Sequence, residues 1–303
     1  MPFFSIIMPC YNAQETLGDS IQSVLDQTCS DWELLCVDDG SSDATPRLLK
    51  AWAKQDARIR VLPIENRGPA VARNYGASQA KGDIMCFLDA DDLWTADKLA
   101  DLKTLFSDAE IGGAYSVIRF FETVGQEDTR STVSDAPLSI PQLMGENPVC
   151  TMSNFSLRRA HFVKHGGLSQ GFVHNEDLEW LIRLVGLGVT IQPVPAAHVW
   201  YRKSEAGLSS DLLSMARSRR QALRTAHYFG FEAEACHEAR YFRYLARRAL
   251  RLDYGSTARS FALRGLTKDP VAFLSPAKRG LPTAVGAFVA PILPQPLRRA
   301  LFT

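Results

Sequence analysis

The 303-residue sequence lacks several features that mark specialised classes of protein. Its 6 cysteines form no C-x-x-C pair, which argues against a zinc site or a disulfide framework. The nearest candidate for a membrane span, residues 280–297, contains four prolines that would break a spanning helix. No basic leader precedes the short apolar run at the N-terminus, so no signal peptide is predicted. We therefore expect a reduced cytoplasmic protein that does not cross a membrane.

Charge is nearly balanced over the whole chain but is distributed unevenly along it. The formal net charge is +1, yet residues 211–303 carry 16 Lys and Arg against 6 Asp and Glu, whereas residues 1–210 carry 18 against 27. Such a split predicts an acidic body that binds or converts a ligand, and a basic appendage that faces an anionic partner. We expect a boundary between them near residue 210.

Apolar runs of strand length alternate with helical periodicity through the first hundred residues. Strict alternation of this kind indicates βαβ units and a parallel sheet, so the expected fold class is α/β. The segments that follow the strands then gather along one edge of the sheet, where ligands bind. The expected strands are Phe3–Met8, Glu33–Val37, Ile59–Ile64 and Ile84–Leu88.

The pattern is less regular after residue 94 and becomes helical and rich in arginine after residue 211. The expected elements are strands at 114–123, 150–157 and 190–200, a polar loop at 128–145, a helix from about Asn175, and helices over 211–268 with breaks near Gly230 and Gly255.

Three carboxylates follow the fourth expected strand, in the stretch Phe87–Trp94 (FLDADDLW). Carboxylates this close oppose one another's ionisation unless a positive charge lies among them. Mg²⁺ and Mn²⁺ prefer oxygen ligands, so Asp89 and Asp91 are candidate ligands of a divalent cation. Taken alone, the cluster fits a helix N-terminus equally well, because the helix dipole favours aspartate there.

Two further motifs follow earlier strands. In Val37–Asp43 (VDDGSSD), a carboxylate can accept a hydrogen bond from the N–H of a nucleobase, and Gly40 lets the backbone turn close to a ligand. Capping of a helix by Ser42 or Asp43 explains the same pattern. In Asn66–Asn74 (NRGPAVARN), a Gly-Pro pair opens a helix, and Arg73 can neutralise a diphosphate or pair with a strand-end aspartate.

The stretches Ser5–Asn12 (SIIMPCYN), Val37–Ser41, Ala72–Asn74 and Phe87–Asp92, in this order and spacing, resemble the family 2 inverting glycosyltransferases of the GT-A fold. The resemblance implies a nucleotide-sugar-binding half at 1–110, an acceptor half at 111–210 and a basic helical C-terminal extension at 211–303. It also implies that Asp39 binds the base, that Asp89 faces the ribose and diphosphate, and that Asp91 holds Mn²⁺ or Mg²⁺, with Asp89 nearby. The implied donor-binding residues are Pro9, Tyr11, Asp38, Asp39, Arg73, Asp89, Ala90 and Asp91.

Inverting transfer also needs a general base across the site from the cation, because the acceptor hydroxyl loses its proton as it attacks. The stretch His174–Trp180 (HNEDLEW) resembles the Glu-Asp motif of the family, which makes Asp177 the expected base and Glu176 its neighbour. A helix N-terminus would keep Asp177 ionised. Helix capping by Asn175 is the alternative interpretation.

One stretch departs from the family pattern. Tyr201–Ser209 carries Ser204 where many relatives have a histidine, so the sequence does not identify the residue that contacts the leaving group there. Arg202, Lys203 and His198 are the candidate replacements.

The resemblance implies a hexosyltransferase of bacterial surface-polysaccharide or lipopolysaccharide synthesis, with a saccharide or lipid-linked saccharide as acceptor. The donor is expected to be a UDP-hexose, because Asp39 suits the N–H of uracil. The basic region 211–303 fits peripheral contact with an anionic membrane or a plain helical bundle, and no motif in it indicates nucleic acid. The alternatives are a non-catalytic sugar-nucleotide-binding subunit and a D-x-D phosphatase, although Leu93 and a fourth-strand location argue against the latter.

Overall fold

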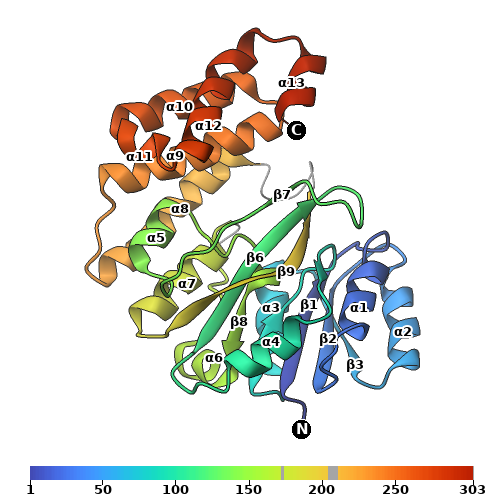
Figure 1. Ribbon diagram of the computed structural model, residues 1–303. Helices are drawn as coiled ribbons and strands as arrows, with labels where there is room; N and C mark the ends of the chain where they lie inside the picture. Colours follow the sequence, from blue (N-terminus) through green and yellow to red (C-terminus); the bar gives the residue numbers. More distant parts are fainter. Residues whose placement is uncertain (172–173, 204–210, 303) are drawn as a thin grey trace. The chain divides into compact units, whose positions relative to one another are not determined.

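The chain folds into two compact units in the computed structural model, which describes residues 1–171, 174–203 and 211–302 (Figure 1). The N-terminal unit comprises Met1–Leu138 and Pro148–Lys203. The helical unit comprises Ser139–Asn147 together with the C-terminal part of the chain, which is described from Asp211. The divisions expected at residues 110 and 210 stay predictions.

One mixed sheet forms the core of the N-terminal unit. Within the described residues its strand order is β3-β2-β1-β4-β8-β6-β9-β5, and β7 pairs with β6. The first four strands are mutually parallel, as the βαβ pattern predicts, whereas β8 runs antiparallel to both β4 and β6. The strands are β1 (Phe4–Cys10), β2 (Trp32–Asp39), β3 (Ile59–Ile64), β4 (Ile84–Phe87), β5 (Leu93–Trp94), β6 (Gly113–Phe121), β7 (Thr129–Arg130), β8 (Ser156–Arg158) and β9 (Ile191–Arg202).

Helices follow the first three strands, and apolar spacing fixes the face that each one buries. In α1, Leu17, Ile21 and Val24 are buried at helical spacing against the sheet. All eight residues of β2 are buried, as is usual for a parallel strand that is covered on both faces. The helices of this unit are α1 (Leu17–Leu25), α2 (Thr45–Gln55), α3 (Pro69–Ser78), α4 (Lys98–Leu105), α6 (Arg159–His165) and α7 (Glu176–Gly186).

Two expected elements differ from the structure. Residues 150–157 are not one strand, because a 3₁₀ turn, η1 (Met152–Asn154), precedes β8. The Thr151 side chain caps this turn by accepting a hydrogen bond from the backbone N–H of Ser153. The expected loop 128–145 contains the helix α5 (Ile140–Gly145), whose first turn is closed by a capping box between Ser139 and Gln142.

The helical unit surrounds an apolar core that includes Leu245, Phe261 and Phe273. The prolines of 280–297 were expected to break a helix: α12 ends at Val289, before Pro291, but Pro282 lies inside α12, which contradicts the expectation for that residue. None of the described helices is both long and apolar enough to cross a bilayer. The helices are α5, α8 (Leu212–Tyr228), α9 (Ala235–Arg251), α10 (Gly255–Lys268), α11 (Pro270–Leu274), α12 (Ala277–Val289), η3 (Ala290–Ile292) and α13 (Gln295–Phe302).

Several arginines of this unit stabilise its interior and do not face solvent. Arg243 is buried and donates to Glu146 at 3.2 Å, while Arg247 reaches the same carboxylate at 2.9 Å. Arg219 is buried as well and pairs with Glu238 at 2.6 Å. The arginine periodicity of 211–251 therefore reflects internal ion pairs as well as an exposed basic surface.

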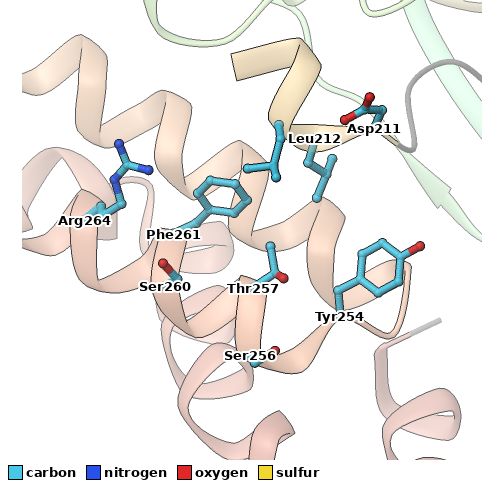
Figure 2. A pocket seen from close by; sticks show the side chains of 9 residues that line it. Asp211, Leu212, Tyr254, Ser256, Thr257, Ser260, Phe261 and Arg264 are labelled. Atoms are coloured by element: carbon cyan, nitrogen blue, oxygen red, sulfur yellow. The ribbon is translucent and has the colours of Figure 1, made fainter. Parts of the chain in front are cut away.

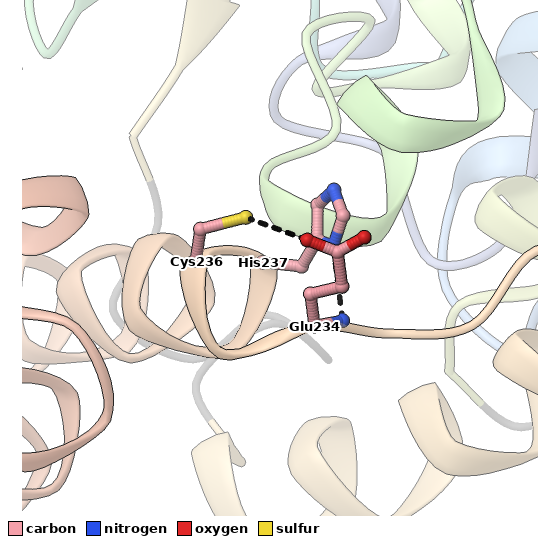
Figure 3. Close-up of side chains that lie close together, drawn as sticks. All are labelled: Glu234, Cys236 and His237. Carbon is pink, nitrogen blue, oxygen red and sulfur yellow. Dashed lines mark hydrogen bonds between the residues drawn. The ribbon is translucent and has the colours of Figure 1, made fainter.

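Two local features of the helical unit involve none of the motif residues. Glu234, Cys236 and His237 come together at the start of α9 (Figure 3), but His237 Nδ1 already accepts the backbone N–H of Glu234 at 3.1 Å, so they form a helix cap. A pocket of about 460 Å³ lies at the N-terminal ends of α8 and α10, with Asp211 and Arg264 at its opposite sides (Figure 2).

Candidate active site

The sequence motifs begin where neighbouring parallel strands end. Strand pairing places Cys10 beside Asp38 and Ile7 beside Phe87, so the segments after β1, β2 and β4 start at one edge of the sheet. The side chain of Tyr11 lies just beyond β1 and is 55% exposed. This edge is where open α/β sheets bind their ligands.

The loops after β1 and β2 are joined to each other. The Asn12 side chain accepts the backbone N–H of Ser42 at 2.9 Å, and the Asn12 N–H donates to the Ser41 hydroxyl at 3.1 Å. Gly40 has a φ of +70°, and an added Cβ would lie 2.8 Å from the backbone nitrogen of Asn66. Only glycine lets the loop after β2 approach the segment after β3 this closely.

Asp38 and Asp39 both fix backbone at this edge. Asp38 Oδ1 accepts the N–H of Ser41 at 3.1 Å. The two carboxylate oxygens of Asp39 accept the N–H groups of Arg67 and Gly68 at 2.8 and 2.9 Å. Each Asp39 oxygen retains a lone pair for a further donor, so this aspartate both anchors the start of α3 and can receive a ligand N–H.

Arg73 joins two motifs that lie far apart in the sequence, one with Asp89 and one with Glu176. Its guanidinium donates to Asp89 Oδ1 at 2.6 Å and to Glu176 Oε1 at 3.4 Å. Burial alone would lower the pKa of Arg73, but Asp89 and Glu176 outweigh it and raise that pKa above its ordinary value. The Nε of Arg73 is buried and has no hydrogen-bond partner among the described residues.

The acidic cluster is held partly by residues that the sequence did not indicate. The Thr151 hydroxyl lies 3.3 Å from Asp89 Oδ2 and 3.4 Å from Asp92 Oδ2, and the Asp89 N–H donates to Ser153 at 2.9 Å. In the sequence, the only indication of these contacts is that polar residues, Thr151 and Ser153 among them, interrupt the apolar stretch 149–157. Burial, followed by the charge of Asp91, raises the pKa of Asp92 well above its usual range.

Asp91 is the carboxylate of this cluster best suited to a cation. Within the described parts of the chain, no side chain donates a hydrogen bond to it, whereas Asp89 pairs with Arg73 and Asp92 accepts from Arg202. Burial, followed by the charge of Asp89, raises the pKa of Asp91 to about 6. Three partly desolvated carboxylates with oxygen donors fit Mg²⁺ or Mn²⁺.

Arg202 is the one candidate replacement for the family histidine that reaches the acidic cluster. Its backbone N–H donates to Asp92 at 3.0 Å, and its Nε donates to the carbonyl of Asp91 at 2.9 Å. Lys203 pairs instead with Glu122 and Asp128, and His198 pairs with Asp101. Ser204 itself lies outside the described residues.

Asp177 lies in the first turn of α7, as expected, but its ionisation differs from the expectation. Burial, followed by the charge of Glu176, raises the pKa of Asp177 to about 7, and Arg73 only partly opposes this shift. The helix N-terminus therefore does not keep this carboxylate fully ionised. Trp180, one turn further, is fully buried between Phe87 and Phe155 and lies in the core.

Comparison with known proteins identifies the family. The sequence pattern described as glycosyl transferase family 2 matches residues 5–166, which is more than half of the chain. The chain belongs to glycosyl transferase family 2. Its relatives include the putative teichuronic acid biosynthesis glycosyltransferase TuaG of Bacillus subtilis, 46% identical over 99 residues, which are 32% of this chain and 39% of TuaG. Another is the Escherichia coli UDP-Glc:alpha-D-GlcNAc-diphosphoundecaprenol beta-1,3-glucosyltransferase WfgD, 50% identical over 96 residues, or 31% and 37% of the two chains.

Solved structures of similar fold confirm the expected GT-A class for this family 2 chain. The mannosyltransferase PcManGT from Pyrobaculum calidifontis, in complex with GDP-Man and Mn²⁺, has a TM-score of 0.61 and 17% identity over 99% of this chain and 84% of that one. Staphylococcus aureus TarS in complex with UDP-GlcNAc has a TM-score of 0.58 and 18% identity over 95% and 79%.

Proposed function

We propose that this chain is a metal-dependent inverting glycosyltransferase that moves a hexose from a UDP-sugar to a saccharide or lipid-linked saccharide. One observation carries the proposal: Arg73 connects Asp89 of the donor motif to Glu176, the neighbour of the expected base Asp177. The residues proposed to hold the leaving diphosphate and those proposed to activate the attacking hydroxyl are thus linked through Arg73.

On the donor side, Asp39 receives the N–H of uracil through its remaining lone pairs, and Pro9 and Tyr11 border the nucleoside. Asp38 shapes this loop, and Asp89 and Ala90 face the ribose and diphosphate. The guanidinium of Arg73, which pairs with Asp89, lies close enough to this motif to offset part of the diphosphate charge. Bound Mn²⁺ or Mg²⁺, held by Asp91 with Asp89 nearby, would supply positive charge that favours departure of the diphosphate.

On the acceptor side, Asp177 acts as general base. The acceptor oxygen bonds to the anomeric carbon, its proton passes to the Asp177 carboxylate, and the bond to the diphosphate breaks on the opposite face, which inverts the configuration. A pKa of about 7 suits this task, because the carboxylate is then ionised near neutral pH and basic enough to take a proton.

The alternatives are less well supported. A D-x-D phosphatase needs the first aspartate as a free nucleophile, but here Asp89 Oδ1 is bound by Arg73 at 2.6 Å. A non-catalytic sugar-nucleotide-binding subunit has no use for a buried carboxylate whose pKa is raised to about 7 at Asp177.

The names of the relatives support a proposal for the acceptor, and the basic charge of region 211–303 supports a proposal for the location. WfgD is named for a diphosphoundecaprenol-linked acceptor, and TuaG for teichuronic acid biosynthesis. We therefore place the reaction in surface-polysaccharide synthesis at the cytoplasmic face of a membrane, with region 211–303 in peripheral contact with it. Residues 114–171 are expected to supply most of the acceptor contacts.

Calorimetric titration of the full-length protein with UDP, GDP and TDP tests the proposal, each nucleotide being added first with Mn²⁺ and then with EDTA. We expect selective binding of UDP that EDTA weakens. Binding of none of the three nucleotides would refute the glycosyltransferase assignment. Equal binding of all three would refute the role of Asp39 in base selection.

A further inference from the structure

An apolar stripe runs along one exposed face of α12 and continues into η3. Leu281, Val285, Phe288 and Ile292 recur at spacings of four, three and four residues, so they share a helix face. Their exposed fractions are 52%, 62%, 38% and 78%. Single exposed apolar residues are ordinary, but four on consecutive turns indicate an interaction surface.

Basic residues outnumber acidic ones in the part of the sequence that contains this stripe. Between residues 255 and 303 there are seven Lys and Arg but only one acidic residue, Asp269. The guanidinium of Arg259, on α10, lies 5.9 Å from the ring centroid of Phe288. Arg259 and Lys278, at the start of α12, are both exposed.

We propose that this face of α12, defined by Leu281, Val285, Phe288 and Ile292, docks onto an anionic lipid surface. A helix lying in the plane of a bilayer interface buries apolar side chains among the acyl chains and keeps basic side chains at the headgroups. The stripe supplies the apolar side chains, and Arg259 and Lys278 supply the basic side chains.

The other occupant to consider is a second copy of the chain. Two copies meeting through this face would bring their basic side chains together, and such like-charge contacts are unfavourable. Anionic lipid complements both the apolar and the charged parts of the surface. The inference names a surface within the contact proposed for 211–303, and it does not depend on glycosyl transfer.

Co-sedimentation of the full-length protein with lipid vesicles tests this surface. Vesicles contain phosphatidylcholine alone or mixed with phosphatidylglycerol. The variants are Val285→Asp and Ile292→Asp, whose exposed positions leave the apolar core intact. The matched control is Val163→Asp on α6 of the N-terminal unit, where the side chain is 70% exposed.

We expect the wild-type protein and the control to sediment with phosphatidylglycerol vesicles, and each stripe variant to partition about tenfold more weakly, since a charge replaces inserted apolar surface. Circular dichroism checks that the variants keep their helices. Equal partitioning of variant and control, or no wild-type partitioning, would overturn the proposal. A wild-type dimer that Val285→Asp dissociates would also overturn it, by assigning the face to a second copy. UDP titration without vesicles tests the proposed function separately.

Discussion

Replacement of Arg73 by glutamine should destabilise the N-terminal unit and shift the pH dependence of transfer. Arg73 is buried and pairs with Asp89 and Glu176, whose side chains are only 25% and 13% exposed to solvent. Removing one partner leaves the other charges desolvated without compensation, which costs about 3 kcal/mol of unfolding free energy for a largely buried network. Because Arg73 also lowers the pKa of Asp177, its loss should move the midpoint of the rate profile above pH 7.

Urea denaturation followed by tryptophan fluorescence measures the first effect. All 5 tryptophans lie in the N-terminal unit, and Trp94 and Trp180 are buried, so the signal reports this unit alone. Arg130→Gln is the control, because it breaks an exposed pair with Glu127 on the same unit and should have little effect. A stability loss for Arg73→Gln no larger than that of the control would refute the network.

Three further predictions concern the reaction. Asp177→Asn should lower transfer about 10³-fold, the usual contribution of a general base, while UDP affinity measured by calorimetry stays unchanged; an active variant would remove Asp177 as base. The wild-type transfer rate should rise with pH through about 7 as Asp177 ionises, and a rate that is flat between pH 5 and 8 would contradict this. Asp91→Asn should give the same UDP affinity with Mn²⁺ as with EDTA, and a retained metal effect would place the cation on other carboxylates.

The pKa of Asp177 also has a consequence for stability. Because the folded protein holds a proton that the unfolded chain loses near its ordinary carboxyl pKa, the unfolding free energy falls as pH rises towards about 7. Asp177→Asn removes this fall, so the variant should be more stable than wild type at pH 8. Urea titrations at two pH values measure the difference.

The spacing of apolar residues along short segments predicts the strands and helices whose formation depends mainly on that segment. The sequence predicts the strand Ile59–Ile64 with its observed bounds and the start of α7 within a residue, because apolar runs and helical periodicity are properties of short segments. The segment 150–157 was mistaken for a strand, because the hydroxyls of Thr151 and Ser153 serve distant partners in the acidic cluster.

In the candidate site, too, some features can be read from local sequence and others depend on how distant segments pack. The residue types and their strand-end positions were visible in the sequence, but the pairing of Arg73 with Glu176 depends on how α3 and α7 pack. The pKa of Asp177 likewise depends on burial, which no local motif reveals. Arg202 was one of three candidates near Ser204, and only the path of β9 distinguishes it from the others.

Helix α5 belongs to the helical unit, but its segment lies in the sequence between two parts of the N-terminal unit. Its segment, Ser139–Asn147, is made before the rest of the N-terminal unit is finished, yet Glu146 pairs with Arg243 and Arg247 of α9, which is made much later. Glu146 therefore gains these two ion pairs only after strands β8 and β9 have been added. A chain cut after Lys203 would leave Glu146 without these two ion pairs, so removal of the later helices also changes a segment that lies between two parts of the N-terminal unit in the sequence.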